Sequence, residues 1–314
     1  MPAPIRLLLR NKSLIGLILL VAAVAMINRN FLAVDNLLNV LRQTSINAVM
    51  AMGMTFVILT AGIDLSVGAL LAFAGAVAAS LVAGGHGMAA TVPLVLLVGV
   101  GLGMLSGLAV TPGGVQPFIA TLVSMTVLRG AVLVFTGGKP IDASGASASE
   151  SFNALGAGYL LSIPVPVLVA AVVYIACWVT LTQTRFGRYV YAVGGNETVA
   201  RLSGVNVTAV KIAVYGISGL LSALAGIILT ARLESAQPTA GTGYELDAIA
   251  AAVVGGTSLA GGKGTIFGTL VGALIIGVLN NALNLMDVSS YYQMVAKGAV
   301  ILLAVLVDRR SKST

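Results

Sequence analysis

The residues IAVYGISGLLSALAGIILTA, at positions 212–231, form an apolar run that contains no Asp, Glu, Lys or Arg. A helix of about 20 apolar residues has the length that crosses the hydrocarbon core of a bilayer, which is roughly 30 Å thick. Comparable runs occur at Val92–Val110, Phe118–Phe135, Tyr159–Leu181 and Ile266–Leu279. This repetition predicts an all-α, polytopic integral membrane protein.

The composition agrees with this fold class. Of the 314 residues, 58% are hydrophobic and only 9% are charged, with a mean hydropathy of +1.03, whereas about a quarter of an ordinary soluble domain is charged. A cleaved signal peptide before a soluble domain is the alternative, because Arg6, Arg10 and Lys12 precede the first apolar stretch. It would explain only one of the runs. We therefore interpret residues 14–27 as an uncleaved first span.

The whole chain, residues 1–314, is expected to form a single transmembrane domain with ten spans. Residues 246–256 are too short to cross alone as a straight helix, so a broken or re-entrant segment is the alternative there. The first span is also short. The predicted spans are roughly 14–27, 44–60, 66–83, 92–110, 118–136, 160–181, 211–231, 246–256, 265–284 and 292–307.

The Lys and Arg residues indicate which side of the membrane each loop occupies. If the first span leaves the cytoplasm and the spans alternate, most cations fall on the inner side, as the positive-inside rule requires. Both termini are then cytoplasmic, and the net charge of +7 indicates topology rather than binding to nucleic acid. The inner cations are Arg6, Arg10, Lys12, Arg185, Arg188, Arg201, Lys211, Lys263, Arg309, Arg310 and Lys312.

Three loops are long enough to have a role. Residues 137–158 and 233–245 lie outside and are acidic on balance, so they are candidates for docking a partner, with a solvated connection as an equal alternative. Residues 182–210 lie inside and mix Arg with Glu. A basic connection held to anionic lipid would need no acid, so this mixture favours a protein partner.

A weak internal repeat appears when the chain is shifted by 200 residues. Asn47-Ala48 then aligns with Asp247-Ala248, and Gly62 aligns with Gly262. Transporters often contain duplicated halves with the substrate path between them. Helices rich in Gly and Ala also align by chance, so both interpretations remain open.

Glycines recur at four-residue intervals in several spans. In lipid, small residues let helix backbones approach closely and gain dispersion contacts. We expect these glycines to form packing surfaces rather than to touch a substrate. They are Gly68, Gly99, Gly103, Gly107, Gly264, Gly268 and Gly272.

Several polar side chains fall within or beside the apolar runs, where they are candidates for function. Asp64 with Ser66 is more simply explained as a helix cap than as part of a transport path. Arg129 and Lys297 could line a hydrated path or extend to an interface. The amides near residue 280 suit sugar hydroxyls and interhelical hydrogen bonds equally well. The candidate path residues are Asn47, Asp64, Ser66, Arg129, Asn280, Asn281 and Asn284.

The sequence contains no recognisable site for a nucleotide or a metal. A phosphate-binding loop ending at Gly262-Lys263 would need glycine at 257 and Ser or Thr at 264, but the residues are Thr257 and Gly264. With His86 as the only histidine and Cys177 as the only cysteine, neither a metal centre, an internal disulfide nor a nucleophile-base pair can be assembled.

Several of these stretches together are similar to the permeases of ribose-type ABC importers. The similarity runs from about Leu14 to Asp308. The stretches are Gln43-Thr44-Ser45, 62–68, 116–122, 184–191, 194–205, 235–252, 255–264 and 289–293.

The resemblance implies a permease subunit in a bacterial inner membrane that works with a second copy of itself. Two cytoplasmic ABC ATPase subunits would bind ATP and Mg²⁺, and a periplasmic sugar-binding protein would deliver the sugar for alternating access. The inner loop would couple to the ATPase, although its Glu-x-x-Ala-x-x-x-Gly spacing differs by one residue from the Glu-Ala-Ala loop of other importers. Its implied coupling residues are Arg185, Gly187, Asn196, Glu197, Ala200, Arg201 and Gly204.

The alternative function is a secondary sugar carrier that is driven by an ion gradient and works alone. It predicts uptake by this chain without partners. The lack of repeated intramembrane acids argues against proton coupling. An integral membrane enzyme is a remote third class.

Overall fold

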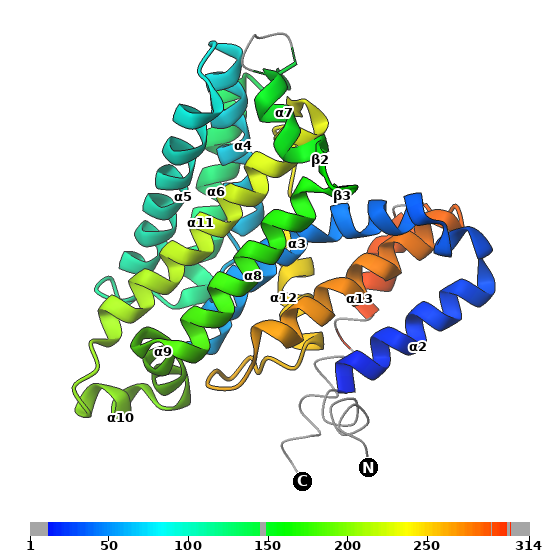
Figure 1. Cartoon of the computed structure of the whole chain (residues 1–314). Helices are drawn as coiled ribbons and strands as arrows, with labels where there is room; N and C mark the ends of the chain where they lie inside the picture. The colour runs from blue at the N-terminus through cyan, green and yellow to red at the C-terminus, as the bar shows by residue number, and fades with distance from the viewer. Residues whose placement is uncertain (1–11, 145–148, 290, 300–301, 303–314) are drawn as a thin grey trace.

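The computed structural model describes residues 12–144, 149–289, 291–299 and 302. It is almost entirely helical (Figure 1). Its long helices are α2 (Lys12–Ile27), α3 (Val34–Leu59), α4 (Val67–Ala83), α5 (Met88–Val110), α6 (Pro117–Thr136), α8 (Val165–Gln183), α11 (Val207–Leu233) and α13 (Ile266–Leu285).

The shorter elements connect these helices. They are η1 (Arg29–Leu32), β1 (Ile141–Asp142), α7 (Ser149–Ala157), β2 (Tyr159–Leu160), β3 (Ile163–Pro164), α9 (Arg185–Gly195), α10 (Glu197–Leu202), β4 (Ser235–Ala236) and α12 (Tyr244–Val254). Both sheets are antiparallel two-stranded pairs: β1 pairs with β4, and β2 with β3.

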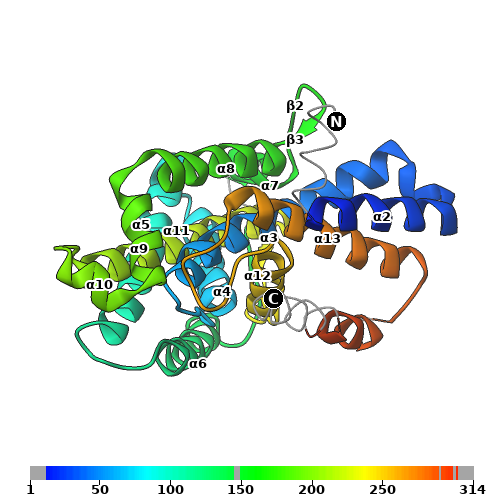
Figure 2. The ribbon, with the colours of Figure 1, turned by 90° about the horizontal axis from the view of Figure 1, so that it is seen from below.

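Helix α11 lies at the centre of the bundle and packs against α3, α4 and α5. Seen from below, α6 and α8 lie on opposite sides of this group, and α2 and α13 extend to one side (Figure 2). In the most apolar stretch of α11, 72% of the residues are buried. In the corresponding stretches of α5 and α6, only 22% are buried. The apolar outer faces of α5 and α6 are therefore suited to lipid rather than to water.

Helix ends follow local sequence signals. Helix α6 begins with Pro117, whose missing N–H would have no partner at that position, and ends at Gly137, which has a left-handed backbone. The side chain of Asn206 caps α11 by accepting from the N–H of Ala209 (3.0 Å). Local sequence signals therefore mark where these helices begin and end.

Five helices among the described residues are long and apolar enough to cross a membrane: α5, α6, α8, α11 and α13. Helices α2 and α4 are apolar but shorter. Residues 291–299 are helical, but the rest of the predicted tenth span and both termini lie outside the described residues. The chain is thus a multi-pass membrane protein, while ten spans and cytoplasmic termini remain predictions.

Helix α3 is longer than the predicted second span. Helix α3 begins at Val34 rather than near residue 44, because the polar residues of 34–43 interrupt the apolar run without interrupting the helix. The predicted sixth span begins at Val165 rather than at residue 160, because Tyr159–Pro164 form the β2–β3 hairpin.

The predicted loops contain structure of their own. Residues 137–158 include β1 and helix α7, which packs on α11. The segment 182–210, predicted to lie inside, contains α9 and α10. Helix α12 has only 11 residues and ends before Gly255, so it cannot cross the membrane as a straight helix.

The glycine stripe of α5 faces α11. A Cβ at Gly99 would collide with Ala223 and Gly219, and one at Gly103 or Gly107 would collide with the backbone of Tyr215 or Ile212. The other glycines approach neighbours equally closely: Gly68 lies against Gly241, Gly264 against Thr257, Gly268 against Gly255 and Gly272 against Ala251.

The two segments of the suggested repeat have the same local form. Each is a helix, a turn and a helix: α3 to α4, and α12 to α13. Ala61 and Gly261, which are 200 positions apart, both have positive φ, at 58° and 85°. The two turns touch, because the N–H of Gly262 donates to the carbonyl of Leu59 (2.9 Å).

Candidate functional site

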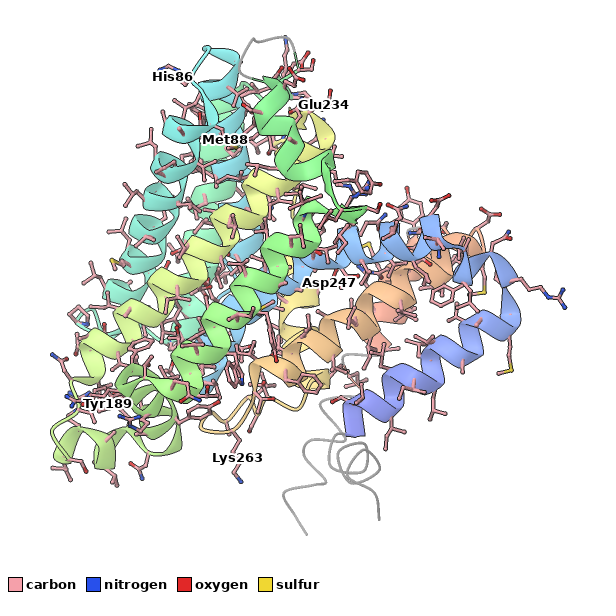
Figure 3. All side chains as sticks on the ribbon, viewed as in Figure 1. His86, Met88, Tyr189, Glu234, Asp247 and Lys263 are labelled. Carbon is pink, nitrogen blue, oxygen red and sulfur yellow. The ribbon has the colours of Figure 1, made fainter. Side chains whose placement is uncertain are left out.

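A cavity of about 190 Å³ lies between α3, α12, α13, the end of α11 and the helical residues 291–299. Asp247, on its wall, lies between the two ends of the bundle (Figure 3). The lining is mostly polar. It comprises Gln43, Thr44, Ile46, Asn47, Leu229, Arg232, Tyr244, Asp247, Gly277, Asn280, Asn284, Gln293 and Lys297.

Helical spacing brings the amides to this cavity. Asn280 and Asn284 are four residues apart on α13 and so share a face, with Gly277 one turn before. On α3, Gln43, Thr44 and Asn47 share a face in the same way. A Cβ at Gly277 would collide with the hydroxyl of Thr44, so the glycine lets the two helices approach at the cavity wall.

An ion pair crosses the cavity. The Lys297 Nζ atom lies 2.9 Å from Asp247 Oδ2, and the Asp247 side chain is 4% exposed against 26% for Lys297. Gln293, one turn before Lys297, donates to Asn284 Oδ1 (2.8 Å) and to the carbonyl of Val288 (2.9 Å). These contacts hold residues 291–299 against α12 and α13.

The structure separates the predicted path residues into four groups. Asn47, Asn280 and Asn284 line the cavity. Asn281, adjacent to Asn280, instead exchanges two hydrogen bonds with Asn36 of α3 (2.9 and 3.1 Å). Arg129 donates from Nη1 to the carbonyls of Pro238 and Ala240, both at 2.9 Å, and so ties α6 to the segment between β4 and α12.

Asp64 and Ser66 do not line this cavity. Asp64 is 1% exposed and accepts from the N–H and hydroxyl of Ser66 (3.0 and 2.6 Å) and from the hydroxyl of Ser218 on α11 (2.7 Å). The bond to the Ser66 N–H satisfies the residue before α4, and Ser66 makes no side-chain cap of its own. The pair ties the turn before α4 to α11.

Six polar residues of the cavity were not among the candidates taken from the sequence: Gln43, Thr44, Arg232, Tyr244, Asp247 and Gln293. Arg232 is next to the predicted end of a span, and Tyr244 is in a predicted outer loop, so neither stood inside an apolar run. The available signal was the 200-residue repeat, which pairs Asn47 with Asp247, and both of these line the cavity.

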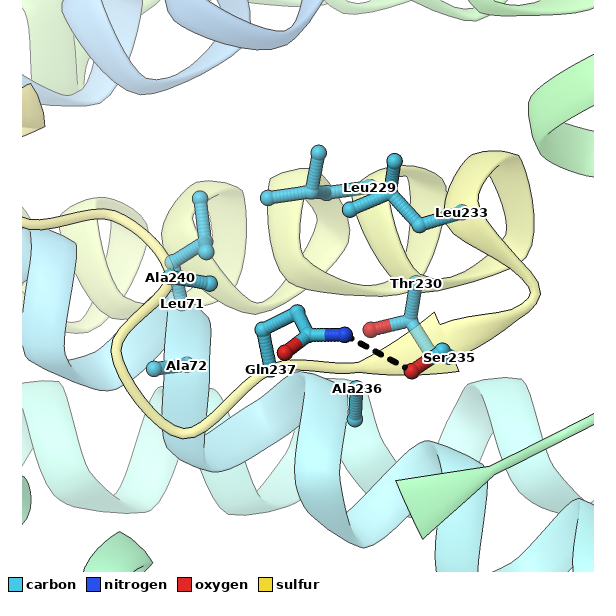
Figure 4. A pocket seen from close by; sticks show the side chains of 9 residues that line it. All are labelled: Leu71, Ala72, Leu229, Thr230, Leu233, Ser235, Ala236, Gln237 and Ala240. Carbon is cyan, nitrogen blue, oxygen red and sulfur yellow. Dashed lines mark hydrogen bonds between the residues drawn. The ribbon is translucent and has the colours of Figure 1, made fainter. Parts of the chain in front are cut away.

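A second pocket, beside β4, is too small for a solute. It is lined by residues of α4, α11 and the segment 235–240, where Gln237 donates to Ser235 Oγ (3.0 Å) (Figure 4). Its volume of about 10 Å³ is close to the space for one water molecule.

The segment between α8 and α11 contains two short helices, α9 and α10. Thr184 caps α9 by accepting from the N–H of Gly187 (3.1 Å), and Asn196 caps α10 by accepting from that of Val199 (3.0 Å). Gly204 follows α10 with φ of +84°, a conformation that favours glycine. Gly187 and Ala200 are buried, whereas Arg185, Asn196 and Arg201 face outward.

Glu197 links α10 to α11. Its carboxylate accepts from Lys211 (2.6 Å) and from Arg201 (2.9 Å). The hydrogen bond from Lys211 is the main reason why the pKa of Glu197 lies below its ordinary value. The link fixes the orientation of α10 on the bundle.

Helix α9 also contacts both repeated turns. The Tyr191 hydroxyl donates to the carbonyl of Gly264 (2.9 Å). A Cβ at Gly194 would collide with the carbonyl of Leu59 and approach the nitrogen of Gly262. Tyr189 of α9 and Lys263 lie at one end of the molecule, and His86 and Glu234 at the other (Figure 3).

Comparisons with known proteins agree with this architecture. Residues 36–305 match the family model described as "Branched-chain amino acid transport system / permease component". The chain is 58% identical over 303 residues to the ribose import permease protein of Haemophilus influenzae, covering 96% of this chain and 94% of the relative.

More distant bacterial relatives match as well. The ribose import permease protein of Bacillus subtilis is 54% identical over 299 residues, covering 95% of this chain and 92% of the relative. The D-allose transport system permease protein of Escherichia coli is 42% identical over 280 residues, covering 89% and 85%. No solved structure matches the chain.

Proposed function

The chain belongs to the permease family of branched-chain amino acid transport systems, and from this premise we propose that it is the membrane-spanning permease of an ATP-driven ribose importer. The observation that carries the proposal is the match to a ribose import permease at 58% identity over 96% of the chain. Identity falls to 42% with the D-allose permease, so ribose is the favoured sugar within the family.

A permease of this class works with an ATPase and a substrate-binding protein. We assign ATP and Mg²⁺ to the ATPase and no cofactor to this chain. The proposed docking surface for the ATPase is the α9–α10 pair, with Arg185, Asn196 and Arg201 facing outward. A helix pair that touches both repeated turns can transmit movement to the helices that begin and end there.

The remaining parts of the assembly follow from the same reasoning. A second copy of the chain completes the transporter, in the inner membrane and surrounded by lipid. The sugar-binding protein docks at the opposite end from α9, on residues 137–158 and 233–245. The pairing of β1 with β4 joins these two segments into one surface.

The test is to reconstitute the chain in liposomes with its partner ATPase and a ribose-loaded binding protein. The expected result is ribose-stimulated ATP hydrolysis together with ribose accumulation. If the complex assembles but only another sugar is accumulated, the choice of ribose is wrong. If the chain alone accumulates sugar along an ion gradient, the ion-coupled secondary carrier replaces the ABC permease.

A further inference from the structure

Among the described residues, three of the six unpaired buried side-chain polar atoms belong to residues that line one cavity. Among the described residues, the buried side-chain atoms without a hydrogen-bond partner are Arg42 Nε, Thr44 Oγ1, Asn47 Oδ1, Asn153 Oδ1, Thr257 Oγ1 and Asn280 Oδ1. Those of Thr44, Asn47 and Asn280 belong to residues that line the cavity between α3, α12 and α13. Buried acceptors without a donor cost free energy, so this grouping suits a ligand that carries hydrogen-bond donors.

The available chemistry matches hydroxyl groups. The two amide oxygens accept hydrogen bonds, and the Thr44 hydroxyl can donate or accept. On the same walls, Arg232 and Lys297 can only donate. A sugar hydroxyl is both donor and acceptor, so one polyhydroxy solute can satisfy both kinds of group. The volume of about 190 Å³ is far above the roughly 10–15 Å³ that one water molecule needs.

The charges of the cavity favour a neutral solute. The carboxylate of Asp247 is already paired with Lys297 at 2.9 Å. Arg232 lies in the last turn of α11, where the carbonyl end of the helix favours a cation. Both cations therefore have a compensating charge within the protein, and an incoming anion gains less from them.

We propose that this cavity is a transient binding site for one neutral polyhydroxy solute of monosaccharide size. The amides of Asn47 and Asn280 and the hydroxyl of Thr44 provide its contacts. The inference rests on the proposed function in one respect, namely that the solute is the transported sugar.

The experiment uses the complete transporter in nanodiscs, with ATPase and binding protein. Cys177 is replaced by alanine, and one cysteine is introduced at a time, as Asn280→Cys in the cavity or Ser289→Cys beyond α13 as an exposed control. The rate of modification by a small, polar thiol reagent is then measured. Saturating ribose should slow modification of Asn280→Cys by about tenfold, because occupied sites cannot react. It should leave Ser289→Cys unchanged.

Two further variants test the site without a cysteine, because Asn280→Cys itself removes the amide. Asn280→Leu removes the amide at similar volume and should lower ribose uptake by about tenfold, while Asn280→Asp, which keeps an acceptor, should retain more uptake.

The outcomes separate this inference from the proposed function. Ribose-stimulated ATP hydrolysis without protection of Asn280→Cys, and with normal uptake by Asn280→Leu, overturns the binding site but keeps the importer. Protection by inorganic phosphate instead of ribose also overturns it, because the site then selects an anion. Protection by ribose in a complex whose ATPase ignores ribose supports the site and contradicts the function.

Discussion

At the scale of single residues, the buried carboxylate of Asp247 depends on Lys297 for a compensating charge. Its side chain is 4% exposed, and Lys297 is the partner that neutralises it. Removing one member of a buried pair leaves an unpaired charge, which typically costs about 3–5 kcal/mol. Exposed pairs such as Arg201 with Glu197, at 64% and 42% exposure, contribute only about 0–1 kcal/mol.

We therefore expect Lys297→Met to lower the thermal stability of the purified protein strongly. The double variant Asp247→Asn with Lys297→Met should recover most of the loss, because no charge is then left unpaired. Unfolding temperatures in detergent measure both, with Arg201→Ala as the control. An equal loss in the single and double variants would show that the ion pair is not the source.

Glu197 provides a test by pH. Its pKa is lowered by Lys211, so the link between α10 and α11 contributes fully above the ordinary value of about 4.3 and is lost as pH falls through the lower folded value. A spin label at Val199→Cys, without Cys177, should gain mobility only at a pH below the ordinary pKa of a glutamate. In Glu197→Gln the same transition should be absent. A transition that persists there would exclude this carboxyl as its cause.

The amides show how far sequence alone reaches at this scale. The pattern predicts an amide cluster on one helix, and the helix is present. It does not predict that Asn280 and Asn284 face a cavity while Asn281 pairs with Asn36. Successive helical residues point about 100° apart, and only the positions of the neighbouring helices decide which face meets which partner.

At the scale of elements, the interface between α5 and α11 depends on the absence of side chains. Gly103 lies against the carbonyl of Tyr215, and nothing lies within 4 Å of a Cβ at Gly101 on the same helix. The two positions therefore form a matched pair, with the same residue type and helix but opposite packing.

Gly103→Ala should separate α5 from α11 and reduce the folded yield and unfolding temperature, by an amount on the order of 1–3 kcal/mol. Gly101→Ala should cause no loss, because its methyl group enters open space. Size-exclusion profiles and thermal unfolding compare them directly. Similar stability of the two variants would contradict the close packing.

Helix α9 offers a second matched pair of glycines. A Cβ at Gly194 would collide with Leu59, whereas nothing lies within 4 Å of one at Gly195. Gly194→Ala should displace α9 from the two turns, so that ATP hydrolysis continues but no longer drives uptake. Gly195→Ala should transport normally. Normal uptake per ATP in Gly194→Ala would exclude this contact as a route of coupling.

The elements themselves are predicted well where apolar runs are unbroken, as for α5, α6 and α11. The predictions fail where a helix contains many polar residues or lies within a predicted loop. Residues 34–43 are helical although half of them are polar, and α7 lies in what composition suggests is a loop. Hydropathy detects which residues suit lipid, but a helix can continue beyond the apolar core.

At the scale of the whole molecule, the two ends carry different structures. His86 lies at the end with Glu234, and Lys263 lies at the end with α9 (Figure 3). If α9 meets the ATPase, the Lys263 end is cytoplasmic. This assignment agrees with the cations expected on the inner side from the sequence.

The orientation can be measured in cells. In a chain with Cys177→Ala, a membrane-impermeant thiol reagent added outside should modify His86→Cys and not Lys263→Cys. Lysed cells should show modification of both, which controls for reactivity. The reverse pattern in intact cells would place α9 outside and remove it as an ATPase contact.

The bond from the N–H of Gly262 to the carbonyl of Leu59 joins two main-chain groups. Alanine-scanning mutagenesis replaces side chains and keeps both of these atoms, so it does not detect this hydrogen bond. Proline cannot remove the donor cleanly, because Gly262 has φ of +69° and proline requires about −65°. Replacing the single amide by an ester through chemical synthesis is the change that reaches it. The connection between the two turns is thus protected from most point mutations, and natural variation can alter the side chains around it without breaking it.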